Sequence, residues 1–255
     1  MSDNSSRIII TKTSASTEEV DAYRTLAGHL KDSPVPGGEI LGNLGLYLTR
    51  SSLSRILFMH DLYQRILTAH GVIMEFGVRW GQNVALFTTF RSMYEPYNYN
   101  RKVIGFDTFE GFPHVAAEDG RAESVVVGGL RVTDHYDARL VELLLTHERL
   151  APRSHLQKFE LVKGDVIETL PRYLAEHPET IISLAYFDLD LYEPTRRCLE
   201  LILPHMTRNS VIGFDEANYA PYPGETLALK EMLPLRNCKL HRSPLSINQS
   251  YLTFE

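Results

Sequence analysis

The spacing of apolar positions differs between the two parts of the chain. In the first part, residues 16–31 and 50–70 place apolar side chains at helical intervals, so both stretches are predicted to be helices. A loop rich in proline and glycine separates them, and polar residues precede them. We therefore predict a helical N-terminal segment that caps the rest of the protein and covers residues 1–70.

In the second part, short apolar runs alternate with helical patterns. Strands are predicted at 72–78, 102–109, 159–165, 181–190 and 210–218, helices at 82–94, 136–150, 166–177, 194–206 and 224–233, and a closing hairpin at 238–243 and 250–255. This alternation indicates a mostly parallel sheet with helices on both faces. The prediction is an α/β, Rossmann-like domain over 71–255 with an antiparallel closing hairpin. A long excursion over 110–158 interrupts it in the manner of a lid.

Composition excludes several classes of protein. The chain has 255 residues and a net charge of −6, and the absence of a lysine- and arginine-rich cluster argues against a nucleic-acid partner. No apolar stretch approaches the roughly 18 residues of a membrane span, and the first residues lack the features of a signal peptide. Two cysteines far apart fit neither a disulfide framework nor a zinc site. We expect a cytoplasmic protein that contacts neither nucleic acid nor membrane.

Every predicted parallel strand ends in acidic residues. The strand ends read MEFG, FDTFEG, VKGD, FDLD and FDE. In open parallel sheets, ligands bind beyond the carboxyl ends of the strands, where the strand order reverses. The sequence therefore predicts a ligand that carries hydroxyl groups or positive charge at this edge.

The first strand is followed by the turn EFGVRWG, which lacks the glycine spacing of a dinucleotide fingerprint. Glu75 would repel a pyrophosphate, but it suits the ammonium and sulfonium groups of S-adenosylmethionine. Asp107 is placed to accept the two ribose hydroxyls, and Asp165 to reach the adenine amino group. Alternatively, Glu75 forms an ion pair and Asp165 caps the next helix. The predicted cofactor-binding residues are Glu75, Phe76, Gly77, Gly81, Asp107, Thr108, Phe109, Gly164, Asp165 and Asp188.

The fourth and fifth strands contribute a second group of carboxylates. Asp188 and Asp190 are two residues apart and would share one face of an extended strand, and Asp215 and Glu216 follow the next strand. Oxygen ligands without histidine or cysteine favour Mg²⁺, Ca²⁺ or Mn²⁺. We expect Asp188, Asp215 and Glu216 to bind the metal and Asp190 to act as general base. The alternative is that Asp188 pairs with an arginine, Arg196 or Arg197, and Asp215 caps a turn.

The motifs MEFGVRWGQN, GFDTFEGFP, VKGDVIETLP, FDLDLYEPT and FDEAN together resemble the metal-dependent sugar O-methyltransferases of the macrocin and mycinamicin type, over about residues 72–231. The resemblance implies that Asp188 is a metal ligand, that Asp190 is the base, and that Asp215 and Glu216 complete the metal site. Glu216 stands where the family usually has aspartate. In some members a histidine from the excursion assists catalysis, and His114 and His135 are the candidates here.

Within this family the chain most resembles a member that acts on TDP-rhamnose. The resemblance implies S-adenosylmethionine- and Mg²⁺-dependent methylation of a hydroxyl, best assigned as the 3-hydroxyl, on a nucleotide-linked 6-deoxyhexose in antibiotic biosynthesis. The N-terminal helices and the 110–158 excursion would cover the site and select the acceptor, and such segments often build homo-oligomer contacts.

Three alternatives are weighed against this function. A nicotinamide-dependent sugar epimerase or reductase requires a Tyr-x-x-x-Lys pair, and none of the 13 tyrosines has a lysine four residues later. A non-catalytic protein that binds a nucleotide sugar would not need Asp188, Asp190 and Asp215. A metal-dependent methyltransferase of catechols or phenols stays open, because carboxylates and a metal ion chelate a catechol as readily as a sugar diol.

Overall fold

The computed structural model describes residues 15–254, so the first fourteen residues of the predicted N-terminal segment lie outside the described part. The chain divides into two compact units, of which one ends at Ser54 and the other begins at Arg55. This division falls earlier in the chain than the predicted boundary at residue 70. The physical reason is that Phe58, Met59 and Leu62 belong to the hydrophobic core of the second unit.

The described part of the first unit, residues 15–54, is mostly helical. It contains α1 (Thr17–Lys31), α2 (Gly37–Ile40) and the 3-10 helix η1 (Leu41–Tyr47). Ser16 and Glu19 form a capping box at the start of α1, which satisfies backbone N–H groups that the helix leaves free. Between residues 15 and 54 no side chain is buried. Leucines in and around η1 are exposed, among them Leu41 at 78%.

The second unit is built on a seven-stranded sheet with the strand order β3-β2-β1-β4-β5-β7-β6. The first five strands in the chain are parallel, and β7 and β6 close the sheet as an antiparallel pair, as predicted. The strand order reverses between β1 and β4, which places a switch point there. The strands are β1 (Val72–Phe76), β2 (Val103–Asp107), β3 (Phe159–Lys163), β4 (Ile182–Phe187), β5 (Met206–Phe214), β6 (His241–Arg242) and β7 (Ser250–Thr253).

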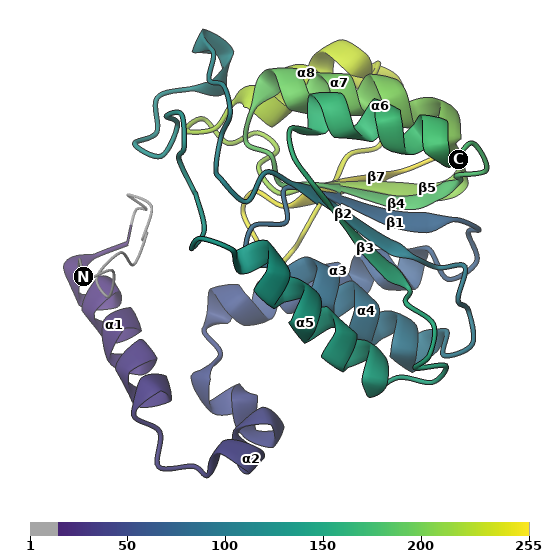
Figure 1. The fold of residues 1–255 in the computed structure, drawn as a ribbon. Coiled ribbons are helices and arrows are strands. Elements are labelled where there is room, and N and C mark those ends of the chain that lie inside the picture. Colours follow the sequence, from purple (N-terminus) through teal and green to yellow (C-terminus); the bar gives the residue numbers. More distant parts are fainter. Residues whose placement is uncertain (1–14, 255) are drawn as a thin grey trace. The chain divides into compact units, whose positions relative to one another are not determined.

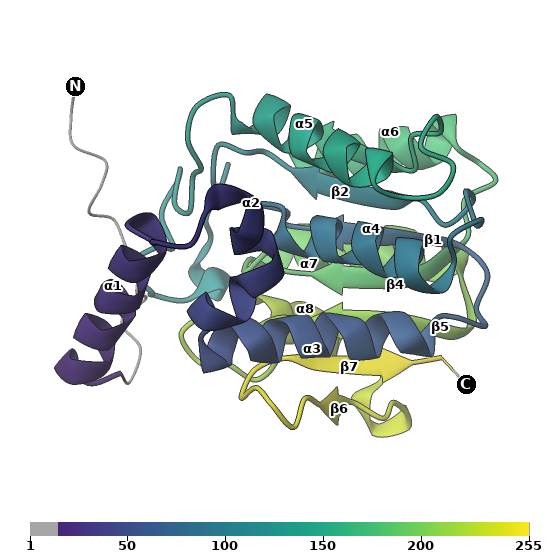
Figure 2. The same cartoon turned by 90° about the horizontal axis from the view of Figure 1, so that it is seen from below.

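Helices cover both faces of this sheet, which confirms the predicted α/β class (Figure 1). One face carries α3 (Arg50–Arg65), α4 (Gln82–Tyr94) and α5 (Tyr136–Arg149), which Figure 2 shows in front of the strands. The other face carries α6 (Val166–Glu176), α7 (Tyr192–Ile202) and α8 (Gly224–Met232). Each face has its own hydrophobic cluster. Three short 3-10 helices lie in connections: η2 (Ala117–Asp119), η3 (Leu203–His205) and η4 (Leu235–Asn237).

A row of phenylalanines sets the level at which the parallel strands end. Phe76 pairs in register with Phe106 and Phe187, and Phe187 pairs with Phe214. Neighbouring rings lie 4.9 to 5.4 Å apart. The residue after each of the last three phenylalanines is an aspartate. Side chains alternate between faces along a strand, so the aspartates project to the opposite face at one common level.

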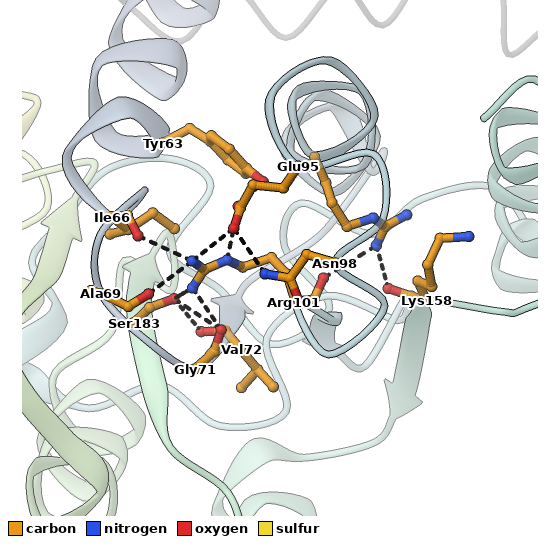
Figure 3. A network of polar contacts seen from close by, with 11 residues as sticks. Tyr63, Ile66, Ala69, Gly71, Val72, Glu95, Asn98, Arg101, Lys158 and Ser183 are labelled. Atoms are coloured by element: carbon orange, nitrogen blue, oxygen red, sulfur yellow. Dashed lines mark hydrogen bonds and ion pairs between the residues drawn. The ribbon is translucent and has the colours of Figure 1, made fainter. Parts of the chain in front are cut away.

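The opposite ends of the strands are held by buried charges that we call the amino-end network: Arg91, Glu95, Arg101, Glu148 and Lys158. Figure 3 labels three of them, Glu95, Arg101 and Lys158. The Arg101 guanidinium donates to Glu95, to the Ser183 hydroxyl and to backbone carbonyls that include Gly71. Arg91 bonds Glu148 at 2.5 Å, and Lys158 Nζ lies 2.6 Å from the other oxygen of Glu148. The network joins the connections before β1, β2 and β3.

Each parallel strand ends two to four residues earlier than predicted, and at β4 this difference changes the site. We expected the fourth strand to run through Asp190, with Asp188 and Asp190 on one face, but β4 ends at Phe187. Asp190 has a φ of 62°, in the left-handed region, so the alternation of a strand does not extend to it. The two carboxylates are placed by a turn instead. None of the helices between residues 15 and 254 is long and apolar enough to cross a membrane.

Candidate active site at the carboxyl ends of the strands

The turn after β1 brings the ends of β1 and β4 into contact. Gly77 has a φ of 91°, and a Cβ there would lie 1.9 Å from the Asp188 carbonyl oxygen, so only glycine fits. Glu75, on β1, is 1% exposed. Its Oε1 accepts a hydrogen bond of 3.0 Å from Asn83 on α4, and its Oε2 is buried without a partner. Since a buried carboxylate oxygen needs a donor, Glu75 is suited to bind an ammonium group.

The ends of β2 and β3 lie next to this turn. The Asp107 carboxylate accepts hydrogen bonds from the backbone N–H groups of Arg79 at 2.7 Å and Phe109 at 2.5 Å. Each of its oxygens can still accept a second donor. The Asp107 carbonyl also accepts from the Gly164 N–H. Asp165 caps α6 by accepting from the Ile167 N–H, which was the alternative considered for it. The Thr108 hydroxyl closes a local turn by donating to the Gly111 carbonyl.

The ends of β4 and β5 and the start of α8 place several carboxylates close together; we call Asp188, Asp190, Asp215, Glu216 and Glu225 the acidic cluster. Asp188 does not pair with the arginines of α7, because Arg196 and Arg197 form ion pairs with glutamates of the same helix. Its partner is Arg55, on α3, which the sequence analysis did not identify. Arg55 Nη1 lies 3.1 Å from Asp188 Oδ2, and Nη2 lies 2.6 Å from Asp215 Oδ2.

Asp215 is held from a second side. Its Oδ1 accepts a hydrogen bond of 2.5 Å from the Tyr186 hydroxyl and one of 2.8 Å from the Gln249 side chain. Tyr186 lies on β4, two residues before Asp188 and on the same face, and Gln249 directly precedes β7. The position of the Asp215 carboxylate is therefore fixed by the sheet itself as well as by Arg55.

Glu225 fixes the two turns that carry the rest of the acidic cluster. It is fully buried, and its two oxygens accept from the backbone N–H groups of Leu189 at 3.0 Å and Glu216 at 3.1 Å. Asp190 is 6% exposed. Glu216 Oε2 is buried without a hydrogen-bond partner. The backbone at both turns is thus held while carboxylate oxygens stay available.

The acidic cluster favours protonation in the absence of a further cation. Burial, and then the charge of Asp215, raise the pKa of Asp188 to about 7 although Arg55 opposes this. Burial and the charge of Asp190 raise the pKa of Glu216 to about 10. Burial, followed by the charge of Asp188, raises the pKa of Asp190 well above its usual range. A positive ion bound here would lower these pKa values.

The donor set fits a hard divalent cation, because it consists of carboxylate oxygens with more negative charge than one arginine balances. As they stand, however, no three or more histidine, cysteine, aspartate or glutamate side chains among residues 15–254 are grouped to hold a metal ion. Arg55 contacts the two carboxylates that would have to converge. The residues fit Mg²⁺ by chemistry, and Asp188, Asp215 and Glu216 would hold it.

The histidine candidates lie outside the acidic cluster. His114 is exposed in the connection after β2, and His135 is exposed directly before α5 with a φ of 59°. The excursion that carries them is nevertheless hydrogen-bonded to segments next to the cluster. The Asp119 carboxylate accepts a hydrogen bond of 2.6 Å from the Tyr192 N–H, and the Ser124 and Tyr222 hydroxyls are hydrogen-bonded to each other. The excursion therefore borders the predicted acceptor side.

Arg55, Tyr186, Glu225 and Gln249 were missed because each acts through a contact between distant parts of the chain. A signal for Arg55 does exist in the sequence. It stands at helical spacing from Phe58, Met59 and Leu62, so it shares the apolar face of α3 and must lie against the sheet. A cation on such a face needs carboxylate partners.

No protein-family model matches the chain, and no curated protein sequence matches it either. Solved structures do. A crystal structure of CalS11, described as a calicheamicin methyltransferase, is 43% identical, covers 94% of each chain and has a TM-score of 0.92. An apo structure of CalS11, described as a TDP-rhamnose 3'-O-methyltransferase in calicheamicin biosynthesis, is 41% identical over 94% of this chain and 96% of that one, with a TM-score of 0.83. The O-methyltransferase NovP is 18% identical over 79% of each chain with a TM-score of 0.59, which bears on the fold alone.

Proposed function

The chain belongs to the methyltransferase family of CalS11 and is a methyltransferase, and we propose that it transfers a methyl group from S-adenosylmethionine to a hydroxyl of a nucleotide-linked 6-deoxyhexose, with Mg²⁺ as cofactor. The observation that carries the proposal is the 43% identity with CalS11 over 94% of both chains. The 3-hydroxyl of TDP-rhamnose is the acceptor that this similarity favours.

The residues at the carboxyl ends of β1 and β2 form the cofactor side of the proposed site. Glu75 receives the ammonium group on its unpartnered Oε2, and Asp107 receives the ribose hydroxyls on oxygens whose other acceptor positions are taken by backbone N–H groups. Gly77 lets the turn after β1 pack directly against the Asp188 backbone, which brings the two halves of the proposed site together. Asp165 would approach the adenine amino group with the oxygen that does not cap α6.

Asp190 is the proposed general base. It accepts the proton of the acceptor hydroxyl as the hydroxyl oxygen bonds to the methyl carbon, whose bond to sulfur breaks so that S-adenosylhomocysteine leaves. The proton then passes to water. Burial raises the pKa of Asp190 well above its usual range, and a cation bound beside it would lower this pKa again, so that Asp190 can accept a proton. When bound, S-adenosylmethionine supplies the methyl group as a sulfonium, and Mg²⁺ supplies a Lewis acid that lowers the pKa of the hydroxyl and fixes the diol.

The remaining expectations concern the acceptor and the assembly. The excursion over 110–158 is held beside the acidic cluster, because Asp119 accepts from the Tyr192 N–H and Ser124 is hydrogen-bonded to Tyr222, which supports a role in selecting the sugar. The first unit exposes Leu41, Leu44 and Leu46 and buries no side chain between residues 15 and 54. Exposed apolar patches are typical of interaction surfaces, so these residues support the proposal of a homo-oligomer.

The test is a calorimetric titration with S-adenosylhomocysteine, followed by methyl transfer to TDP-rhamnose with Mg²⁺ and with EDTA. We expect saturable binding, a 3-O-methyl product, and loss of the product in EDTA. Binding with turnover of a catechol but not of TDP-rhamnose would replace the sugar by a phenolic acceptor. Turnover that is unaffected by EDTA would remove the metal from the proposal, and absence of binding would contradict the cofactor.

A further inference from the structure

Arg55 contacts the carboxylates that the proposed function assigns to the metal. Among the lysines and arginines of residues 15–254, it is the one in ion-pair contact with Asp188 and Asp215. Its two terminal nitrogens each contact a different carboxylate, so the guanidinium spans the ends of the neighbouring strands β4 and β5. A guanidinium is a planar fork that suits such a bridge.

A divalent ion and this guanidinium compete for the same oxygens. Mg²⁺ requires carboxylate oxygens at about 2.0–2.1 Å in octahedral geometry, whereas Asp188 Oδ2 and Asp215 Oδ2 are already taken by Arg55 at 3.1 and 2.6 Å. Two positive groups that converge on one pair of oxygens also repel each other. Binding of the ion therefore requires Arg55 to leave at least one carboxylate.

The surroundings allow this exchange. The Arg55 side chain is 28% exposed, so it can turn toward water while the backbone of α3 stays in place. Asp215 keeps its position without Arg55, because Tyr186 and Gln249 hold its other oxygen. Glu225 likewise holds the backbone of the turns that carry Asp190 and Glu216. Arg55 is thus the replaceable member of a set whose other members are fixed.

We propose that Arg55 is an internal counter-cation that occupies the Asp188 and Asp215 carboxylates when no divalent ion is bound and is displaced when the ion binds. Arg55 then acts as a positioning residue: it holds the two carboxylates in place in the metal-free protein, and it lowers their affinity for the metal ion. The inference rests on the proposed function, because that function assigns these carboxylates to a metal.

The experiment measures Mn²⁺ binding by electron paramagnetic resonance of the free ion, with the full-length wild type and the variants Arg55→Met and Arg65→Met. Arg65 is the matched control, since it lies on the same helix but pairs with Asp61 outside the acidic cluster. We expect Arg55→Met to bind Mn²⁺ about tenfold more tightly than wild type, which corresponds to the loss of a competing interaction of about 1.4 kcal/mol. Arg65→Met should bind as wild type does.

Thermal unfolding gives a second readout that does not involve activity. In EDTA, Arg55→Met should unfold at a lower temperature than wild type, and saturating Mn²⁺ should close most of this difference. A structural ion pair without competition would leave the difference equal in both conditions. If folded Arg55→Met is obtained only when Mn²⁺ is present, that dependence supports the proposal. The ammonium group of Arg55→Lys cannot span both carboxylates, so this variant should bind Mn²⁺ with an affinity between those of wild type and Arg55→Met.

The outcomes separate this inference from the proposed function. Equal or weaker Mn²⁺ binding by Arg55→Met, with binding by the wild type, overturns the role of Arg55 and leaves the metal site in place. If Arg55→Met binds Mn²⁺ and wild type does not, the result supports the proposal that Arg55 competes with the ion for the carboxylates. If none of the proteins binds Mn²⁺, both the metal requirement and the inference are wrong.

Discussion

The two ends of the parallel strands carry buried charges in opposite ways. In the amino-end network, three cations contact two carboxylates, Glu95 and Glu148, and their remaining donors bond hydroxyl and backbone carbonyl oxygens. Figure 3 shows these contacts around Arg101. In the acidic cluster at the other end, carboxylates outnumber the contacting cation, and Glu216 Oε2 lacks a partner.

This difference separates a structural role from a functional one. A charge network whose donors and acceptors are matched fixes one conformation and leaves nothing for a ligand to bind. A surplus of one sign is unfavourable in the free protein, and a ligand of opposite sign relieves it. The same sheet therefore has one end that holds connections together and another that is prepared for a positively charged group.

The largest effect is expected for Asp190. Replacement by asparagine removes the proposed base, so methyl transfer should fall by about 10²- to 10⁴-fold, whereas S-adenosylhomocysteine should bind nearly as before. Turnover and calorimetry on the same preparation measure both quantities. The control is Glu193→Gln, which changes an exposed carboxylate on α7 that pairs with Arg196 of the same helix. Near-normal turnover of Asp190→Asn would refute its role as base.

Arg101→Ala tests the other end of the comparison. It leaves Glu95 without its buried partner, so we expect a loss of about 3–5 kcal/mol in the free energy of unfolding. Urea unfolding measures it, with Arg139→Ala as the exposed-pair control at about 0–1 kcal/mol. Saturating Mn²⁺ should not restore the loss in Arg101→Ala. Restoration by the metal would mean that the two ends are not independent.

Glu75→Gln is expected to weaken S-adenosylhomocysteine binding by about tenfold. The substitution keeps the shape of the side chain but removes the charge that pairs with the ammonium group, and a hydrogen bond to a charged group contributes about 1.5–3 kcal/mol. Calorimetry measures the change. An unchanged affinity would show that Glu75 is only a buried partner of Asn83.

The smallest effects concern pH, and the two ends should differ in sign. The pKa of Asp188 is raised from 3.8 to about 7, so the folded metal-free protein holds a proton there that the unfolded chain has lost. Stability therefore falls as the pH rises from about 4 to about 7. At the other end, burial alone would raise the pKa of Glu95, but hydrogen bonds from Arg101, Tyr63 and Asn98 lower it below 4.5. Its contribution is present above pH 4.5 and is lost on acidification.

Urea midpoints across this pH range, in EDTA, separate the two groups. Asp188→Asn should flatten the decline between about pH 4 and 7 relative to wild type, and Glu95→Gln should flatten the loss below pH 4.5. If Asp188→Asn leaves the decline unchanged, the surplus charge of the acidic cluster does not affect stability as described.

Much of this arrangement could be predicted from sequence because it repeats a local rule. In β1, β2, β4 and β5, a phenylalanine at the strand end is followed by glycine or aspartate, and parallel strands bring those ends to one edge. The bridge by Arg55 could not be predicted in the same way, since it joins residues 133 and 160 positions apart. The left-handed Asp190 depends on packing by Glu225 and Gly224, which no local preference of aspartate specifies. The cofactor, metal and catalytic roles of the predicted residues stay predictions.

Hydrogen exchange with and without S-adenosylhomocysteine tests most directly that methyl-transfer chemistry belongs to the carboxyl-end side of the sheet. Peptides that cover 75–82, 107–111 and 188–190 should gain protection, and peptides that cover 95–102 should exchange at the same rate in both samples. Protection confined to 95–102, or absent from 75–82, would contradict the account.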